Sequence, residues 1–164
     1  MVMRSLLIVA GLCLCACQAD LTETAELPVL DRPFFDCRVQ PVLTKYCAVN
    51  ACHGTAKRYF YIFARNRLRL GGAEDERNAF MRASERDFNY AASLGFVVPG
   101  HPEESLLALK PLEQRAGGYF HVGATIFGDM DVFASTDDND YQVLADWING
   151  ATEDPNCVEP GSDL

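Results

Sequence analysis

The sequence is poor in positive charge. Its 164 residues include 14 Lys and Arg against 23 Asp and Glu, a formal net charge of −9 at pH 7. A surface of this sign repels nucleic acid and anionic lipid headgroups, so we expect neither as a partner. A protein that docks here through charge should instead present a basic docking face.

Alternation of apolar and polar residues, the pattern of a strand, is nearly missing, and the sequence has no internal repeat or low-complexity segment. Apolar residues recur at helical spacing over 33–46, which contains Pro41 as a flaw or break, and over 138–151. A solvated helix is expected over 73–92, and a long irregular stretch over 113–137. The pattern predicts an all-α fold with long loops, and such loops usually wrap something.

The only long apolar run stands at the start of the chain, after a single positive charge. It predicts a signal peptide over residues 1–16, too short to span a bilayer as a stable helix. Residues 14–17, "LCAC", resemble the bacterial lipobox, which implies lipidation of Cys17; ordinary cleavage after a small residue is the alternative. Gln18 gives no signal for inner-membrane retention. We therefore expect a lipid-anchored protein of the periplasm or cell envelope, at the outer membrane.

The rest of the chain divides into two parts. Residues 17–31 are rich in acids and predict a tether between the lipid and the domain. Residues 32–164 are then one folded domain, long enough to build a core.

Four of the seven cysteines remain once the signal peptide and the lipid site are set aside: Cys37, Cys47, Cys52 and Cys157. Exported proteins seldom keep four free thiols. If Cys47 and Cys52 hold a haem as thioethers, Cys37 and Cys157 are left to form a disulfide that ties the ends of the domain together. The alternative is that all four form disulfides, in one of three pairings.

The stretch "YCAVNACHGT" (46–55) carries the most specific chemistry. A haem c attachment usually reads Cys-x-x-Cys-His, whereas four residues separate Cys47 from Cys52 here. Residues 48–51 must therefore bulge outward if both sulfurs are to reach one porphyrin. Cys52 and His53 remain adjacent, which keeps the second thioether and the proximal iron ligand in register.

Two neighbours suit such a bulge. Asn50 tolerates the left-handed backbone that a tight bulge needs, and Gly54 allows a close approach to the ring edge. Two other interpretations compete with haem. One is a disulfide between Cys47 and Cys52, and the other is a zinc site built from Cys37, Cys47, Cys52 and His53.

Four ordered stretches together resemble the small cytochrome c-like domains of bacterial secreted proteins and lipoproteins, of the planctomycete type with an extended Cys-x4-Cys-His-Gly loop. They are "VQPVLTKYCAVNACHGT", "ARNRLRL", "VVPGHPEESLLALKPL" and "DDNDYQVLADWINGA". The resemblance runs from Phe34 to Ala151. It implies a cytochrome c-like domain whose loops wrap one covalent haem c at Cys47 and Cys52, with His53 as proximal ligand.

The sixth iron ligand has two candidates. Of the three histidines, His101 stands where the family has Asp or Asn at a helix cap, and we expect it at the surface. His121 lies in a glycine-rich loop that resembles a His-x-Gly-Gly segment, with Ala124 in place of the second glycine. Met130 is the rival, and an open position is the third possibility. A methionine would raise the reduction potential, and a second histidine would lower it.

These features predict a monohaem c-type cytochrome that passes single electrons to and from a redox partner protein outside the cytoplasm. No conspicuous acid–base cluster accompanies the cysteine motif, so we do not expect an enzyme. The alternative is a disulfide-stabilised lipoprotein that acts as a haem-based sensor or as a haemless interaction module.

Overall fold

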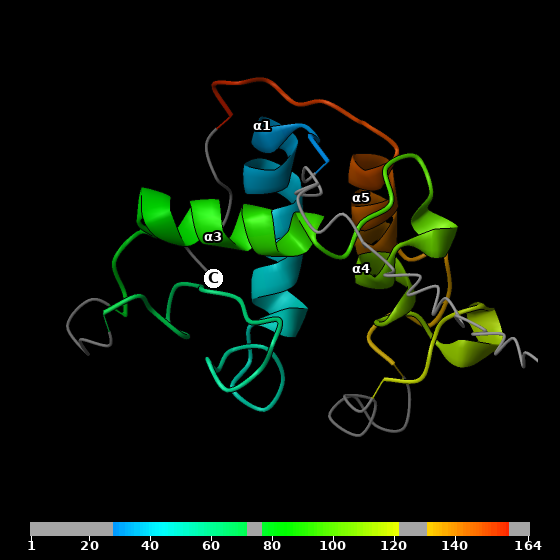
Figure 1. Cartoon of the computed structure of the whole chain (residues 1–164), viewed down its shortest axis with the longest axis horizontal. Coiled ribbons are helices and arrows are strands. Elements are labelled where there is room, and N and C mark those ends of the chain that lie inside the picture. Colours follow the sequence, from blue (N-terminus) through cyan, green and yellow to red (C-terminus); the bar gives the residue numbers. More distant parts are fainter. Residues whose placement is uncertain (1–27, 72–76, 122–130, 158–164) are drawn as a thin grey trace, which may run out of the picture.

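The computed structural model describes residues 28–71, 77–121 and 131–157. Cys17, the signal peptide and most of the tether lie outside these ranges, as does Met130. Within them the chain is helical, and its only strand-like feature is an isolated bridge between Leu112 and Phe133 (Figure 1). The expected all-α class is therefore correct for this part of the chain.

The helical elements follow one another from the N-terminal end as α1 Arg32–Phe34, the π-helix η1 Phe35–Val39, α2 Gln40–Val42, the π-helix η2 Leu43–Cys47, α3 Ala83–Leu94, the 3-10 helix η4 Pro102–Glu104, α4 Leu106–Leu109, the 3-10 helix η5 Gln114–Ala116 and α5 Asn139–Ile148. The first four run on without a break as one N-terminal helix. The helix expected over 73–92 is wrong in its start, because residues 77–82 are irregular and the helix begins at Ala83.

Pro41 widens the N-terminal helix and does not break it. A proline has no N–H, and its ring presses on the carbonyl four residues earlier, here that of Cys37. The preceding turn is a π-turn, in which the Gln40 N–H bonds to the Phe35 carbonyl five residues back. A second π-turn ends the helix at Cys47. The first half of the cysteine motif thus lies on the last, widened turn of a helix.

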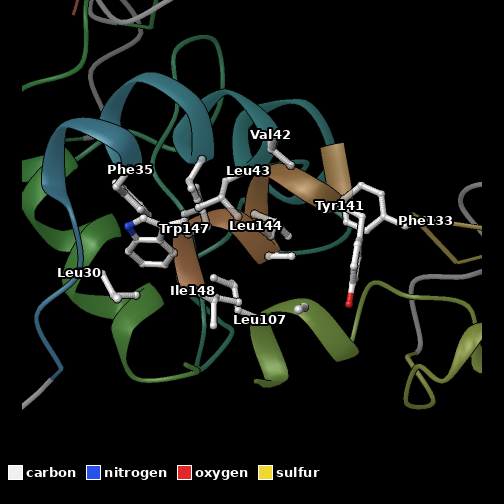
Figure 2. Close-up of a cluster of buried hydrophobic side chains, with 14 of the residues drawn as sticks. Leu30, Phe35, Val42, Leu43, Leu107, Phe133, Tyr141, Leu144, Trp147 and Ile148 are labelled. Carbon is white, nitrogen blue, oxygen red and sulfur yellow. The ribbon is translucent and has the colours of Figure 1, made fainter. Parts of the chain in front are cut away.

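The core forms where α5 packs against the N-terminal helix (Figure 2). Trp147 is fully buried, and its ring centroid lies 5.1 Å from that of Phe35. Its indole N–H donates to the Asp31 carbonyl at 2.9 Å. Leu144 and Ile148 complete the buried stripe of α5. Each such side chain contributes about 2 kcal/mol by leaving water, so the N-terminal helix is firmly held.

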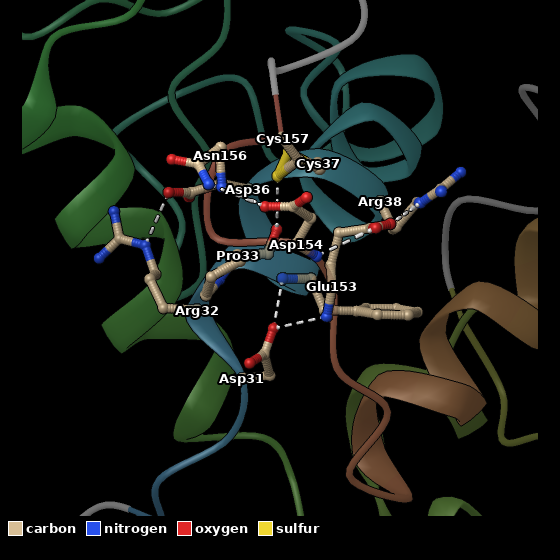
Figure 3. The surroundings of a disulfide bond; sticks show 11 residues. Asp31, Arg32, Pro33, Asp36, Cys37, Arg38, Glu153, Asp154, Asn156 and Cys157 are labelled. Atoms are coloured by element: carbon tan, nitrogen blue, oxygen red, sulfur yellow. Dashed lines mark hydrogen bonds and ion pairs between the residues drawn. A yellow bond between two sulfur atoms is a disulfide. The ribbon is translucent and has the colours of Figure 1, made fainter.

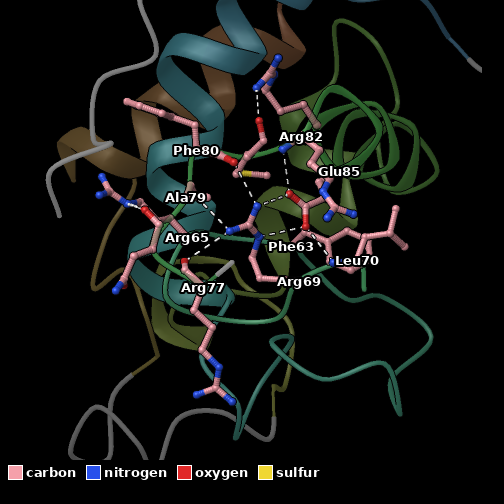
Figure 4. Close-up of polar contacts among 12 residues, drawn as sticks. Phe63, Arg65, Arg69, Leu70, Arg77, Ala79, Phe80, Arg82 and Glu85 are labelled. Atoms are coloured by element: carbon pink, nitrogen blue, oxygen red, sulfur yellow. Dashed lines mark hydrogen bonds and ion pairs between the residues drawn. The ribbon is translucent and has the colours of Figure 1, made fainter. Parts of the chain in front are cut away.

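Buried polar groups hold the irregular segment 58–70 against α3 (Figure 4). The Arg69 guanidinium donates two hydrogen bonds of 2.9 Å to the carboxylate of Glu85, and both side chains are almost fully buried. Asn89 accepts from the Phe63 N–H and donates to the Phe63 carbonyl. Because these buried groups are paired, the segment keeps a fixed path without regular structure.

A disulfide joins Cys37, in η1, to Cys157 across 120 residues (Figure 3). Beside it, Arg38 forms an ion pair with Glu153, and the Asp31 carboxylate accepts from the Glu153 N–H at 3.2 Å. The segment that follows α5 is thereby tied back to the first helix. This is the disulfide that the sequence predicts if Cys47 and Cys52 hold a haem.

Replacing both cysteines, Cys37→Ser with Cys157→Ser, should lower the free energy of unfolding by about 4 kcal/mol, because a cross-link over so long a loop restricts the unfolded chain. Guanidinium unfolding monitored by circular dichroism measures the loss. Adding a reductant should produce a similar loss in the unaltered protein and none in the double variant. A reductant effect that persists in the double variant would assign the stabilisation to other thiols.

Candidate functional site

The loop between the two motif cysteines folds back onto the end of the N-terminal helix. The His53 N–H donates to the Cys47 carbonyl at 2.9 Å, and both the Cys52 and Gly54 N–H groups donate to the Val49 carbonyl at 2.9 Å. Asn50 and Ala51 are left exposed at the tip. Residues 48–51 therefore bulge outward, and Cys52 and His53 return to the helix end where Cys47 lies.

One detail of the loop differs from the sequence expectation, and a second adds to it. Asn50 does not take the left-handed conformation; among the described residues outside glycine, only Asn66 has a positive φ, of 59°. Gly54 is required by the backbone of the loop itself. A Cβ at this position would lie 2.1 Å from the Ala48 carbonyl oxygen, so no side chain fits while the loop stays closed.

His53 is half-buried and oriented by the backbone. Its Nδ1 lies 2.8 Å from the Phe60 carbonyl oxygen, so Nδ1–H donates and the lone pair stands on Nε2. Burial lowers the pKa of His53 below its usual value, and the charges of His121 and Arg58 add to the lowering. The imidazole is thus neutral near pH 7, with Nε2 available as a metal ligand and Nδ1 held as in many metal-binding histidines.

Cys47 and Cys52 are free thiols, both half-buried. Burial raises the pKa of Cys47 to about 12, with the neighbouring Cys52 adding to the effect, and burial also raises the pKa of Cys52. Both sulfurs are protonated near neutral pH. The structure therefore does not contain the disulfide proposed as a rival. The rival zinc site also loses one of its four ligands, because Cys37 is bonded to Cys157.

His121 lies opposite His53. The two ring centroids are 6.1 Å apart, and the ring planes differ by 9°. Two imidazoles that bind one metal ion from opposite sides, each at a nitrogen–metal distance of about 2 Å, have ring centres about 6 Å apart. The His121 Nδ1 lies 3.3 Å from the buried Asp131 Oδ1, a contact of ion-pair length that is not aligned as a hydrogen bond.

The chain that leads to His121 is anchored on the end of α4. Gly118 passes so close to Leu112 that a Cβ would lie 1.7 Å from its carbonyl oxygen. The Tyr119 N–H donates to the Leu109 carbonyl at 2.9 Å, and Lys110 Nζ donates to the Phe120 carbonyl at 3.0 Å. The position of His121 is therefore set by backbone contacts on both preceding residues.

The third histidine, His101, is expected at the surface, and the structure places it there. His101 is exposed, and its Nδ1 lies 3.0 Å from Glu103, as expected of a surface residue. Glu103 raises the pKa of His101. His101, Glu103 and Glu104 gather on the surface, but nothing further marks that exposed group as a metal site. Met130 lies outside the described residues.

Aromatic side chains extend the site on the His53 side. The Phe60 ring lies 5.0 Å from the His53 ring and 4.9 Å from that of Phe96, both in edge-to-face arrangement. The sequence analysis missed Phe60, Phe96 and Asp131. No signal in the sequence marks the Phe60 carbonyl as the partner of His53, seven residues earlier, because that pairing depends on the path of the intervening segment.

Comparison with protein-family models, with curated proteins and with solved structures found no match. None of the helices in the described ranges is long and apolar enough to cross a bilayer.

The donor set fits a covalently held haem. Two unpaired, protonated thiols and one neutral imidazole gather at the end of a helix, and a second imidazole lies parallel to the first at metal-sharing distance. The apolar edges of Phe60 and Phe96 suit a porphyrin more than a hydrated ion. Cys47 and Cys52 would hold the ring, and His53 and His121 the iron.

Replacing Gly54 by Ala should lower the free energy of unfolding by about 3 kcal/mol, because the new methyl group meets the Ala48 carbonyl and forces the loop to open. Thermal or chemical unfolding measures the change. Gly95→Ala is the matched control: its Cβ would meet its nearest atom at 3.4 Å, so its effect should stay within about 1 kcal/mol. Equal effects of the two substitutions would refute the tight loop.

Proposed function

We propose that this chain is a lipid-anchored monohaem c-type cytochrome that transfers single electrons outside the cytoplasm. Cys47 and Cys52 would hold haem c through two thioether bonds, and His53 and His121 would hold its iron. The protein needs no catalytic acid or base and is not an enzyme. Cys17 carries the lipid, and residues 17–31 tether the domain to the membrane in the periplasm or cell envelope, at the outer membrane.

One observation carries the proposal: the parallel imidazoles of His53 and His121, 6.1 Å apart, one of which follows directly on Cys52. The free state of Cys47 and Cys52 supports it, because an exported domain that oxidises Cys37 and Cys157 would be expected to pair the other two thiols unless they served another purpose. The resemblance to planctomycete-type cytochromes points the same way.

The residues of this chain have separate tasks. When bound, the haem supplies an iron that cycles between two oxidation states. The Phe60 carbonyl fixes the orientation of His53, and burial keeps that imidazole neutral and therefore able to bind a metal. His121 as second ligand favours a lower potential than Met130 would give. The rings of Phe60 and Phe96 form an apolar wall beside His53.

Covalent attachment is tested by haem staining of the denatured protein, expressed together with a cytochrome c maturation system. The unaltered chain should stain, and Cys47→Ser with Cys52→Ser should abolish the stain, because no thioether can then form. Cys37→Ser with Cys157→Ser removes the same number of thiols and should keep it. A colourless unaltered protein with a Cys47–Cys52 disulfide would overturn the proposal and favour the haemless interaction module.

The identity of the sixth ligand is tested by the response of the reduced protein to carbon monoxide. The unaltered protein should not respond, because both axial positions are filled. His121→Ala should open one position and give a carbon monoxide shift, whereas Met130→Ala should not. The reverse result would assign the ligand to Met130. A shift already present in the unaltered protein would favour the haem-based sensor.

A further inference from the structure

The charge of this chain is unevenly distributed. Residues 57–86 contain eight of the 14 basic residues of the chain and four acids, a net charge of +4 within a chain of −9. The remainder of the chain therefore has a net charge of −13. A partner approaching this segment meets a field of the opposite sign to the one that the net charge suggests.

This basic segment lies against the cysteine loop. Arg58 Nη2 donates to the Ala51 carbonyl, at the tip of the loop, at 3.4 Å. Arg67 and Arg77 line a hollow of about 180 Å³ together with Asn50 and Gly54 of the same loop. The positive charge is thus placed beside the residues that attach the haem.

Some arginines of this segment have hydrogen-bond or ion-pair partners within the chain, and others have no acidic partner in the part of the chain that the structure describes. Arg69 is buried in its ion pair with Glu85, and Arg65 is held by the Asn78 carbonyl (Figure 4). Arg58 and Arg67 are exposed, and no carboxylate of the described residues forms an ion pair with either. Within the described ranges no carboxylate neutralises these two guanidinium groups, so both can pair with the carboxylates of another molecule.

An exposed aromatic residue follows Arg58 directly in the chain. Tyr59 is fully exposed, and it stands between Arg58, which contacts the cysteine loop, and Phe60, which contacts His53. Tyrosine and arginine are the residues most often found at the energetic centre of protein interfaces. We call Lys57, Arg58, Tyr59 and Arg67 the basic face.

We propose that the basic face is the docking site for an acidic redox partner protein. This inference rests on the proposed electron-transfer function and names the partner class of the same site. The net charge of −9 favours a basic partner. Charges farther from the contact than about 10 Å are screened at 0.1 M salt, however, so the arginines at the contact determine the charge sign of the partner. The partner's carboxylates pair with Arg58 and Arg67 beside the cysteine loop.

Calorimetric titration of the purified full-length protein with poly-L-glutamate at low ionic strength tests the face without depending on haem. The unaltered protein should bind, and Arg58→Gln with Arg67→Gln should weaken binding by about tenfold, on the order of threefold for each charge. Arg38→Gln with Arg115→Gln makes the same change of charge elsewhere and should alter binding by less than about twofold.

Equal losses in the two double variants would overturn the proposal, since binding would then follow net charge alone. Stronger binding of poly-L-lysine than of poly-L-glutamate would overturn it in favour of a basic partner. Arg58- and Arg67-dependent binding to vesicles of anionic phosphatidylglycerol, tighter than to poly-L-glutamate, would overturn it in favour of a membrane surface.

The rate at which ferricyanide oxidises the reduced protein tests whether electrons leave through the basic face. The rate should fall as salt is added, because the local charge attracts the anion, and Arg58→Gln with Arg67→Gln should lower it several-fold at low salt. A rate that rises with salt would overturn the proposal. Poly-L-glutamate binding through Arg58 and Arg67 in a protein without a haem spectrum would support the face and refute electron transfer.

Discussion

The hydrogen bond from the His53 N–H to the Cys47 carbonyl holds the candidate site together. It closes the loop between the two cysteines and brings Cys52 and His53 to the end of the N-terminal helix. Its closure depends on Gly54, where the loop touches the Ala48 carbonyl. The helix end is in turn fixed by packing on α5. The geometry of the candidate site therefore depends on the short loop between the two cysteines and on the helix from which that loop leaves.

Much of this arrangement can be predicted from the sequence, and the parts that cannot be predicted have physical reasons. Helical spacing predicts the first and last helices, and the count of cysteines predicts the Cys37–Cys157 disulfide if Cys47 and Cys52 hold a haem. The start of α3 was placed too early, because polar residues with helical propensity do not by themselves say where a helix packs. The bonds of Phe60 to His53 and of Arg69 to Glu85 join groups whose proximity depends on the path of an irregular segment.

Two kinds of buried polar group have different roles in this small domain. Glu85 and Asn89 complete the hydrogen bonds of a segment without regular structure, so that the segment can place Phe60 under His53. Among the described residues, the Oδ1 of Asp131, beside His121, has no aligned hydrogen-bond partner, and burial raises the pKa of Asp131. Buried atoms without a hydrogen-bond partner are rare in native proteins. Elsewhere in the described ranges, Asp36 Oδ1 in η1 and Ser93 Oγ in α3 are also without one, so an unpartnered atom does not by itself separate the site from the scaffold.

The central claim is that His53 and His121 bind one haem iron. X-ray absorption at the iron edge of the purified full-length protein tests it most directly, because the signal reports the atoms bound to the metal. We predict a six-coordinate iron surrounded by nitrogen alone, four from the porphyrin and one from each imidazole. A sulfur neighbour, a five-coordinate iron, or the lack of iron in protein from a cell competent for cytochrome c maturation would contradict the account.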